Sequence, residues 1–192
     1  AFSGALPVAA SATPMLAVFA SDKGPGDAER APLMSEAGTI LARHGARIVC
    51  LADGALEAIP LITSARAAGG DVLILADEGF VAPPALAEVP VERIDDPEAR
   101  LKRMGELAQV FVGLPGSLAS TAALYRTWAR AGAGASGKPV VLLNKNRAFE
   151  AMRGMAADIL SHSVPHADRL VVFTDNVEDL WNKVNWALSV HS

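Results

Sequence analysis

The sequence predicts a doubly wound α/β domain, with a mostly parallel sheet of about six to seven strands and helices on both faces. Short apolar runs alternate about six times with longer segments of helical periodicity. Several of the helical segments end at a glycine, which favours the end of a helix. The apolar runs are continuously hydrophobic, as expected of parallel strands that are buried on both faces.

Each element is predicted from its local composition. Strands are expected where short runs are rich in β-branched and aliphatic residues, at 15–20, 46–51, 72–76, 91–94, 110–112, 139–143 and 170–173. Helices are expected at 28–44, 55–68, 97–108, 117–130, 148–160 and 177–188. Asp96 suits the N-cap of the third of these helices. Residues 1–14 are interpreted as an N-terminal arm, and residues 15–192 as one domain.

Composition limits the class of protein. With 192 residues, of which 51% are hydrophobic and 20% charged, the chain suits one globular domain. The net charge of −4 argues against a general nucleic-acid binder, and no apolar run is long enough to predict a membrane span. The single cysteine, Cys50, fits a cytoplasmic protein without disulfides. Cys50 is expected to be a buried strand residue rather than a reactive thiol.

The segment from Val110 to Trp128 is the strongest candidate for a functional site. A buried strand enters a helix through the turn at Pro115 and Gly116. Free N–H groups at the start of that helix, with the positive end of the helix dipole, favour an anion. The hydroxyl-bearing side chains beside this position are Ser117, Ser120 and Thr121. The alternative is that Ser117 only caps the helix and the turn is an ordinary one.

Other loops and charged residues are expected near the same edge of the sheet. Ligands of such sheets bind beyond the carboxyl ends of the strands, where loops 21–27, 52–55, 113–120 and 144–147 would gather. Lys23 would face either a phosphate or solvent. Arg100 and Arg103 share a helical face and suit anion recognition, but the same helix also has the spacing for ion pairs of Lys102 with Glu98 and Glu106.

Several kinds of site are not supported by the sequence. The four histidines match no metal-binding spacing, so no metal is expected. A nucleophilic serine in a Gly-x-Ser-x-Gly turn is absent. Trp181 and Trp186 are expected to pack in the core or at a subunit contact.

The order of several segments resembles the LONELY GUY family, often labelled lysine decarboxylase-like. These segments are LAVFAS, ILARHGARIVCLADG, SARAAGGDVLIL, RLKRMGELAQVFVGLPGS and KPVVLLN, and the resemblance covers residues 15–188. It implies a Rossmann-like fold and a dimeric phosphoribohydrolase that releases a cytokinin base from its nucleoside monophosphate. The chain is also similar to the related molybdenum-cofactor carrier proteins, which keep the fold and bind rather than hydrolyse.

The hydrolase signature of that family is only partly retained. It reads Pro-Gly-Gly-x-Gly-Thr-x-x-Glu with an upstream arginine, and it is matched here by Arg100, Pro115 and Gly116. The remaining positions differ: Ser117 and Ala119 replace glycines, Ser120 replaces the threonine, and Ala122 and Ala123 stand where glutamates are expected. An acid/base group contributes about 10²- to 10⁴-fold in rate. Since a methyl group transfers no proton, hydrolysis is expected to be lost before anion binding.

The leading hypothesis is therefore a catalytically degenerate cytoplasmic homodimer that binds a nucleotide or another small phosphorylated ligand. No cofactor is required, and a nucleoside monophosphate or phosphate is the expected occupant. Membranes and nucleic acids are not expected partners. The predicted ligand-binding residues are Ser21, Asp22, Gly54, Arg100, Pro115, Gly116, Ser117, Leu118, Ala119, Ser120 and Thr121.

Two alternatives remain at this point. The chain could be an active nucleoside monophosphate phosphoribohydrolase with a substitute carboxylate, for which Asp22, Asp53 and Glu57 are the candidates near the mouth of the site. It could also be a structural or interaction protein whose dimer surface is its purpose. The family's dimer packs helices near the central turn, where Leu124, Tyr125 and Trp128 would lie.

Overall fold

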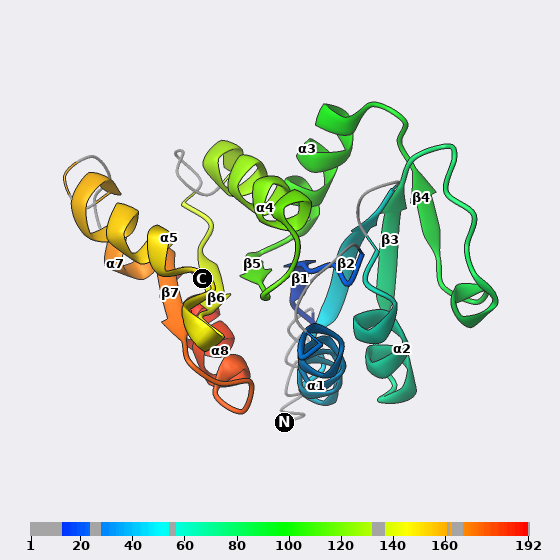
Figure 1. The fold of residues 1–192 in the computed structure, drawn as a ribbon, viewed down its shortest axis with the longest axis horizontal. Helices are drawn as coiled ribbons and strands as arrows, with labels where there is room; N and C mark the ends of the chain where they lie inside the picture. The colour runs from blue at the N-terminus through cyan, green and yellow to red at the C-terminus, as the bar shows by residue number, and fades with distance from the viewer. Residues whose placement is uncertain are drawn as a thin grey trace, which may run out of the picture.

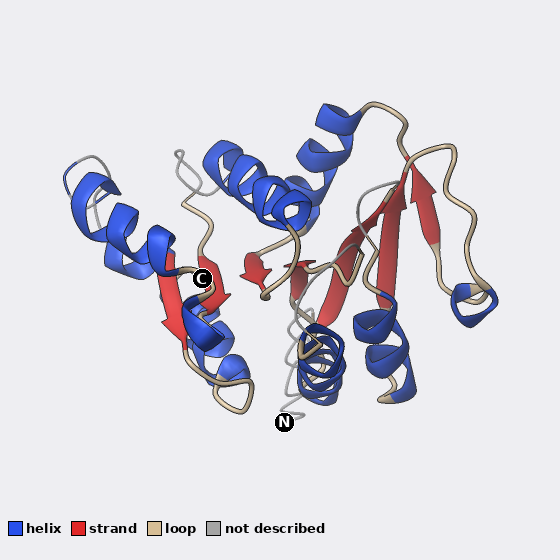
Figure 2. Ribbon diagram, viewed as in Figure 1, coloured by secondary structure: helices blue, strands red, loops and turns tan. Residues whose placement is uncertain are grey.

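A single seven-stranded sheet organises the chain, in the order β4-β3-β2-β1-β5-β6-β7. Every neighbouring pair of strands is parallel. The computed structural model describes residues 13–23, 28–53, 57–131, 137–160, 162 and 167–191. The expected doubly wound α/β fold is therefore confirmed, and its sheet is parallel throughout (Figure 2).

The strands and helices alternate along the chain. The strands are β1 (Met15–Phe19), β2 (Arg47–Ala52), β3 (Val72–Ala76), β4 (Val91–Arg93), β5 (Val110–Gly113), β6 (Val140–Leu143) and β7 (Val171–Thr174). The α-helices are α1 (Arg30–Arg43), α2 (Ile59–Ala67), α3 (Pro97–Leu107), α4 (Leu118–Ala131), α5 (Glu150–Met155), α7 (Ala167–Leu170) and α8 (Leu180–Val190). Short 3₁₀ segments at Pro84–Leu86 and Lys145–Arg147 and a π-helix at Ala156–Leu160 complete the connections.

Helices cover both faces of the sheet, and each face has its own hydrophobic core. Successive residues of β1 show the division, since Leu16 and Val18 pack with α1, α2 and α8. Ala17 and Phe19 pack instead with α3, α4 and the segment around α5. In Figure 1, α3 and α4 lie above the sheet, and α1, α2 and α8 lie below it.

Close packing of α1 on α2 depends on a glycine. A Cβ at Gly38 would lie 2.4 Å from the carbonyl oxygen of Leu61, so a larger residue would force the two helices apart. Gly45 and Gly69 follow their helices with φ of +80° and +83°, a conformation that side chains disfavour. The glycine signals in the sequence thus mark real helix ends.

The topological switch point lies between β1 and β5. These strands are hydrogen-bonded neighbours, with Val18 opposite Val112 and Phe19 opposite Gly113. The chain leaves β1 toward α1 on one face and leaves β5 toward α4 on the other face. The carboxyl edge between these two strands is where sheets of this type bind ligands.

Most predicted elements are confirmed, and the differences are mainly at helix starts. The helix expected over 148–160 begins at Glu150 as α5, because Phe149 is not helical, and continues directly into the π-helix at Ala156–Leu160. The last helix begins at Leu180 rather than at Val177, since residues 175–179 form bends and a turn. Among the described residues, no helix combines the length and apolar character needed to cross a membrane.

Candidate anion site at the switch point

Two loops meet closely where β1 and β5 end. A Cβ at Gly116 would lie 2.5 Å from Ser120 Oγ and 3.2 Å from the backbone nitrogen of Ser21. No residue larger than glycine fits there without movement of these neighbours. The structure thus brings the predicted residues of the first loop and of the α4 turn together, although the sequence separates them by about ninety-five residues.

Hydroxyl groups at the start of α4 are used by the helix itself. Ser117 Oγ accepts a hydrogen bond from the N–H of Ser120 at 3.1 Å, so Ser117 is the N-cap. The hydroxyls of Ser120 and Thr121 donate to the carbonyl oxygen of Ser117 at 2.9 and 3.1 Å. The capping alternative is therefore correct for the Ser117 side chain, and these hydroxyls are not free to face a ligand in this conformation.

Backbone donors remain at this helix start. The N–H groups of Leu118 and Ala119 occupy the first turn, where an α-helix offers no acceptor of its own. The surface here is open, since the side chain of Leu118 is 86% exposed, while Pro115, Gly116 and Ser117 are half-buried. What the turn can offer an anion is therefore its backbone and the helix dipole.

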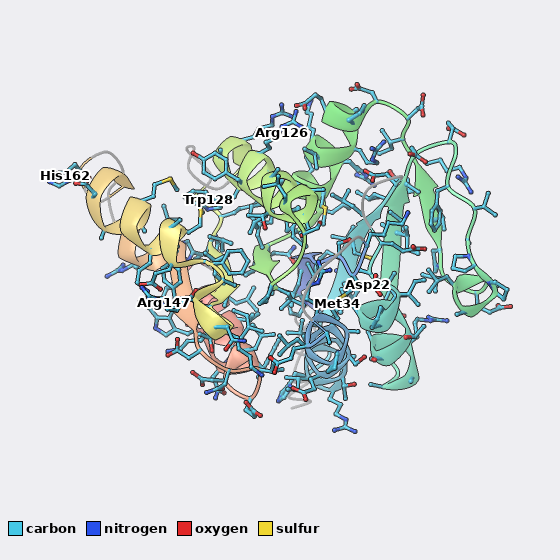
Figure 3. The ribbon with its side chains drawn as sticks, viewed as in Figure 1. Asp22, Met34, Arg126, Trp128, Arg147 and His162 are labelled. Carbon is cyan, nitrogen blue, oxygen red and sulfur yellow. The ribbon has the colours of Figure 1, made fainter. Side chains whose placement is uncertain are left out.

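The loop after β1 is held in place by Ser21. Its side chain is buried, and its hydroxyl accepts hydrogen bonds from the N–H groups of Lys23 at 3.2 Å and Glu57 at 3.3 Å. The N–H of Asp22 donates to the carbonyl oxygen of Glu57 at 3.1 Å. Ser21 therefore organises the loop and is not available as a ligand group, whereas the side chain of Asp22 is exposed (Figure 3).

Arg100 is buried and makes hydrogen bonds within the chain. Its guanidinium donates to the carbonyl oxygens of Ile94 at 2.7 Å and Asp95 at 3.1 Å, and to the carboxylate of Asp53 at 3.3 Å. Its side chain is 6% exposed. The arginine lies at the carboxyl edge of the sheet and does not face solvent, but Asp53 occupies the position that an anionic ligand would take beside it.

The charged face of α3 differs from the expected one. Lys102 pairs with Glu106 at 4.0 Å, as the spacing predicted. Glu98 contacts Arg126 and Arg130 of α4 rather than Lys102, because α3 and α4 pack side by side. Arg103 pairs with Glu92 of β4 at 2.9 Å.

A cavity of about 370 Å³ opens at the same edge of the sheet, over the ends of β1, β2 and β3. Its lining residues are Lys23, Asp53, Glu57, Asp77, Gly79, Phe80 and Val81. Lys23 lies 3.9 Å from the carboxylate of Glu57 and is the one cation of this lining. The cavity therefore joins two of the three predicted substitute carboxylates, Asp53 and Glu57, and the third, Asp22, is not part of its lining.

Two lining residues, Asp77 and Phe80, were not predicted from the sequence. A signal was available, because Leu-Ala-Asp occurs twice, at 51–53 and at 75–77. The two copies end neighbouring strands in register, with Leu51 opposite Leu75 and Ala52 opposite Ala76. Equivalent aspartates of neighbouring parallel strands reach the same edge of a sheet, which is why both line the cavity. Gly54, another predicted site residue, lies outside the described residues.

The two positions of the family glutamates face different surroundings. Ala123 is 8% exposed and packs in the hydrophobic core between α4 and the sheet. Ala122 is exposed. Leu124 and Trp128 are buried in the same core, so the prediction that they form a dimer surface was wrong. Figure 3 shows Trp128 on the sheet side of α4 and Arg126 on its outer side.

Cysteine and metal chemistry find no support at this site. Cys50 is buried in β2, and burial raises the pKa of its thiol to about 12. It is therefore a packed, protonated side chain, as the sequence indicated. Within the part of the chain that the structure describes, no three His, Cys, Asp or Glu side chains are grouped to hold a metal ion.

Comparison with known proteins identifies the fold. By sequence, the chain matches no protein-family model and no curated protein. By structure, it is similar to the Moco carrier protein from Chlamydomonas reinhardtii, with a TM-score of 0.70 and 20% identity over 93% of this chain and 99% of the other. The molybdenum cofactor binding protein from Rippkaea orientalis gives a TM-score of 0.67 and 13% identity over 95% and 100% of the two chains. The structural-genomics target TM1055 gives a TM-score of 0.64 and 19% identity over 90% of this chain and 99% of the other. The chain thus has the Rossmann-like fold of these proteins over nearly its whole length.

Proposed function

We propose that this protein binds a small phosphorylated ligand, such as a nucleoside monophosphate, at the carboxyl edge between β1 and β5. The observation that supports this most directly is the close approach of the β1 loop to the turn before α4, where the space beside Gly116 is filled by Ser120 and by the backbone of Ser21, while Leu118 at the start of the helix is exposed. Leu118 and Ala119 present first-turn N–H groups there. Backbone donors at a helix start suit a phosphate without any special side chain.

The remainder of the ligand would extend toward the cavity over β2 and β3. That cavity, at about 370 Å³, falls within the usual range for small-molecule sites. Its lining combines Lys23, three carboxylates and the ring of Phe80, so it offers both polar contacts and a hydrophobic surface. Arg100 lies beside this cavity, because its partner Asp53 is one of the lining residues.

Binding without hydrolysis is the activity that these residues favour. Hydrolysis in the resembled family needs the signature glutamate, and Ala123 stands at that position. Because Ala123 packs in the core, its neighbours offer no room for a water and a base at this position. The proposed role of this protein is therefore that of a carrier or sensor of its ligand rather than that of a phosphoribohydrolase.

A proline at the first helical position gives a sharp test. Leu118→Pro removes one proposed N–H donor, yet proline is well tolerated at that position and the exposed Leu118 side chain contributes little to the core. Leu118→Ala is the matched control, since it keeps the N–H. In calorimetric titrations with AMP, we expect Leu118→Pro to weaken binding by about tenfold, and Leu118→Ala to bind like the wild type.

Adenosine, which lacks the phosphate, should bind much more weakly than AMP to all three proteins. The absence of heat with AMP at millimolar concentration would contradict the proposal. So would equal affinities of the proline and alanine variants, because the helix start would then not hold the phosphate.

A second candidate occupant comes from the structural neighbours, whose names specify the molybdenum cofactor. If this chain carries the same cofactor, protein purified from cells grown with molybdate should contain molybdenum in a fixed ratio to the chain. Elemental analysis of the purified protein measures this ratio. A value at background would remove this candidate without affecting the nucleotide proposal.

The hydrolase alternative retains one supporting observation, since Asp53 and Glu57 both line the cavity. A carboxylate there is placed to activate water. Release of free adenine from AMP, lost in Asp53→Asn or Glu57→Gln, would establish that activity. No adenine release would exclude it.

Self-association is a further part of the proposal. With Leu124 and Trp128 buried, Tyr125 is the one residue of the predicted surface that remains accessible, at 44% exposure. Sedimentation velocity distinguishes a dimer from a monomer. A dimer that Tyr125→Asp dissociates would place the contact on the outer face of α4, and a monomer would end the dimer hypothesis.

A further inference from the structure

A second cavity lies at the opposite end of the sheet from β4, along the edge strand β7. Its volume is about 440 Å³, and its lining residues are Arg153, Val171, Val172, Phe173, Asp179, Asn182, Lys183 and Trp186. These residues come from α5, β7, α8 and the turn before α8. Its lining shares no residue with the cavity over β1, β2 and β3 or with the turn before α4, and in Figure 1 β7 lies at the other end of the sheet from β4.

Its charge differs from that of the first cavity. The lining carries two cations, Arg153 and Lys183, and one carboxylate, Asp179. Lys183 lies 3.8 Å from Asp179, and Arg153 lies 3.5 Å from Glu150, with side chains that are 39–46% exposed. Pairs this exposed contribute little, about 0–1 kcal/mol. Both cations can therefore exchange their partners for a ligand anion at low cost.

The aromatic residues of the cavity are placed beside these cations. The guanidinium of Arg153 lies over the ring of Phe173, 4.4 Å from its centroid. Trp186 is 42% exposed on α8 and lines the same cavity. An exposed indole in the same cavity as a cation that lies over an aromatic ring favours a ligand that is itself flat and aromatic.

The edge of the sheet supplies a backbone donor. The carbonyl oxygen of Thr174 accepts from the N–H of Asn144 at 2.7 Å, so Thr174 faces β6. Phe173, the preceding residue, therefore turns its N–H toward the outer edge, where no strand of the described chain pairs with β7. Since the Arg153 guanidinium lies over the ring of the same residue, a carboxylate bound at this edge could accept from both donors.

We infer that this cavity binds an aromatic carboxylate, whose ring lies against Trp186 and whose acid group lies between Arg153 and the edge of β7. Lys183 adds a second positive charge at the rim. The inference does not depend on the proposed nucleotide function, because it uses none of the same residues. It gives the molecule two separate small-molecule sites, one near the middle of the sheet and one along its edge strand β7.

The probe for this site is 2-naphthoate, with the neutral 2-naphthamide as its matched control. Titrations are followed by the fluorescence of the tryptophans and by calorimetry, in the presence and absence of AMP. We expect the acid to bind about tenfold more tightly than the amide, and saturating AMP to leave this affinity unchanged.

Two variants and one control locate the binding. Arg153→Gln and Trp186→Ala are each expected to weaken naphthoate binding by about fivefold or more. Arg66→Gln on α2 removes an exposed arginine far from the cavity and should have no effect. Lys183→Gln gives a second charge variant at the cavity itself.

Three results would overturn the inference. These are the absence of binding at millimolar naphthoate, equal affinities for acid and amide, and equal effects of Arg153→Gln and Arg66→Gln. Loss of AMP binding alone would not overturn it, since that result concerns the site at the start of α4.

Discussion

The guanidinium of Arg100 donates a hydrogen bond to the carboxylate of Asp53 at 3.3 Å, in a buried position at the carboxyl edge of the sheet. This pair joins α3 to the end of β2. It also means that the arginine which matches the resembled family is already neutralised by a group of the chain itself. An incoming phosphate must compete with Asp53 or bind beside it.

Removal of that competitor should strengthen anion binding. In Asp53→Ala, Arg100 keeps its bonds to two carbonyl oxygens but loses its carboxylate partner. We expect the affinity for AMP to rise by about threefold to tenfold, and the free energy of unfolding to fall by about 1–2 kcal/mol. Calorimetry and urea denaturation measure the two effects. Unchanged or weaker AMP binding would show that Arg100 takes no part in holding the phosphate.

The contact at Gly116 predicts a steric effect that a second substitution relieves. Gly116→Ala should lower the free energy of unfolding by about 1–3 kcal/mol, because the new Cβ meets Ser120 Oγ and the nitrogen of Ser21. Adding Ser120→Ala removes the nearer of these atoms and should recover part of the loss. The control is Gly154→Ala in α5. A Cβ at Gly154 would meet no neighbouring atom within 4 Å, so the free energy of unfolding should rise slightly, by about 0.5 kcal/mol. Equal effects at Gly116 and Gly154 would contradict the close approach of the two loops.

The cap of α4 predicts a loss of stability that depends on the replacement. Ser117→Ala removes the acceptor of the Ser120 N–H and should cost about 1 kcal/mol, whereas Ser117→Gly should cost only a few tenths. Asp96→Ala provides a comparison, since Asp96 caps α3 by accepting from the N–H of Ala99 at 2.9 Å. Chemical denaturation at neutral pH measures all three. A glycine variant that is less stable than the alanine variant would argue against the cap.

Restoration of the family glutamate should fail for a structural reason. Ala123→Glu places a carboxylate among the buried residues of α4 and the sheet, which should cost about 3 kcal/mol or more. Ala122→Glu lies on the exposed face and should change stability by less than about 0.5 kcal/mol. Neither variant is expected to release adenine from AMP. Adenine release by a folded Ala123→Glu protein would mean that the position opens toward the site.

The buried thiol predicts a pH dependence of stability. Burial raises the pKa of Cys50 to about 12 in the folded chain, whereas an exposed cysteine titrates near 8.5. Above the lower value the unfolded chain loses this proton and the folded chain keeps it. The contribution of this pKa difference to the free energy of unfolding is therefore fully present below about pH 8.5. It is lost as the pH rises toward 12, at up to about 1.4 kcal/mol per pH unit.

Chemical denaturation of the wild type and of Cys50→Ala between pH 8 and 11 measures this pH dependence of stability. The stability advantage of the wild type over the variant should shrink as the pH rises. A difference between the two proteins that stays constant with pH would show that the thiol titrates normally and is accessible. Reaction with a thiol reagent at pH 8 should likewise require unfolding of the wild type.

The architecture could be predicted from the sequence, because the signals for it are local. A strand such as 72–76 is recognisable from its own apolar residues, and Asp96 and Gly45 mark helix ends through chemistry within one turn. The 3₁₀ turn at Lys145–Arg147 was not predicted, because it depends on the positive φ of Asn146 and Arg147, residues that are not glycine.

What the charged side chains of the site face depends on the tertiary structure. The hydroxyls of Ser117, Ser120 and Thr121 are occupied by local hydrogen bonds, one of the two alternatives that the sequence left open. Asp53 and Arg100 lie far apart in the sequence, and their pairing follows from how α3 crosses back over the sheet. Composition and spacing state which groups a chain possesses. Which of them are already satisfied depends on contacts between distant segments, and those exist only once the sheet has assembled.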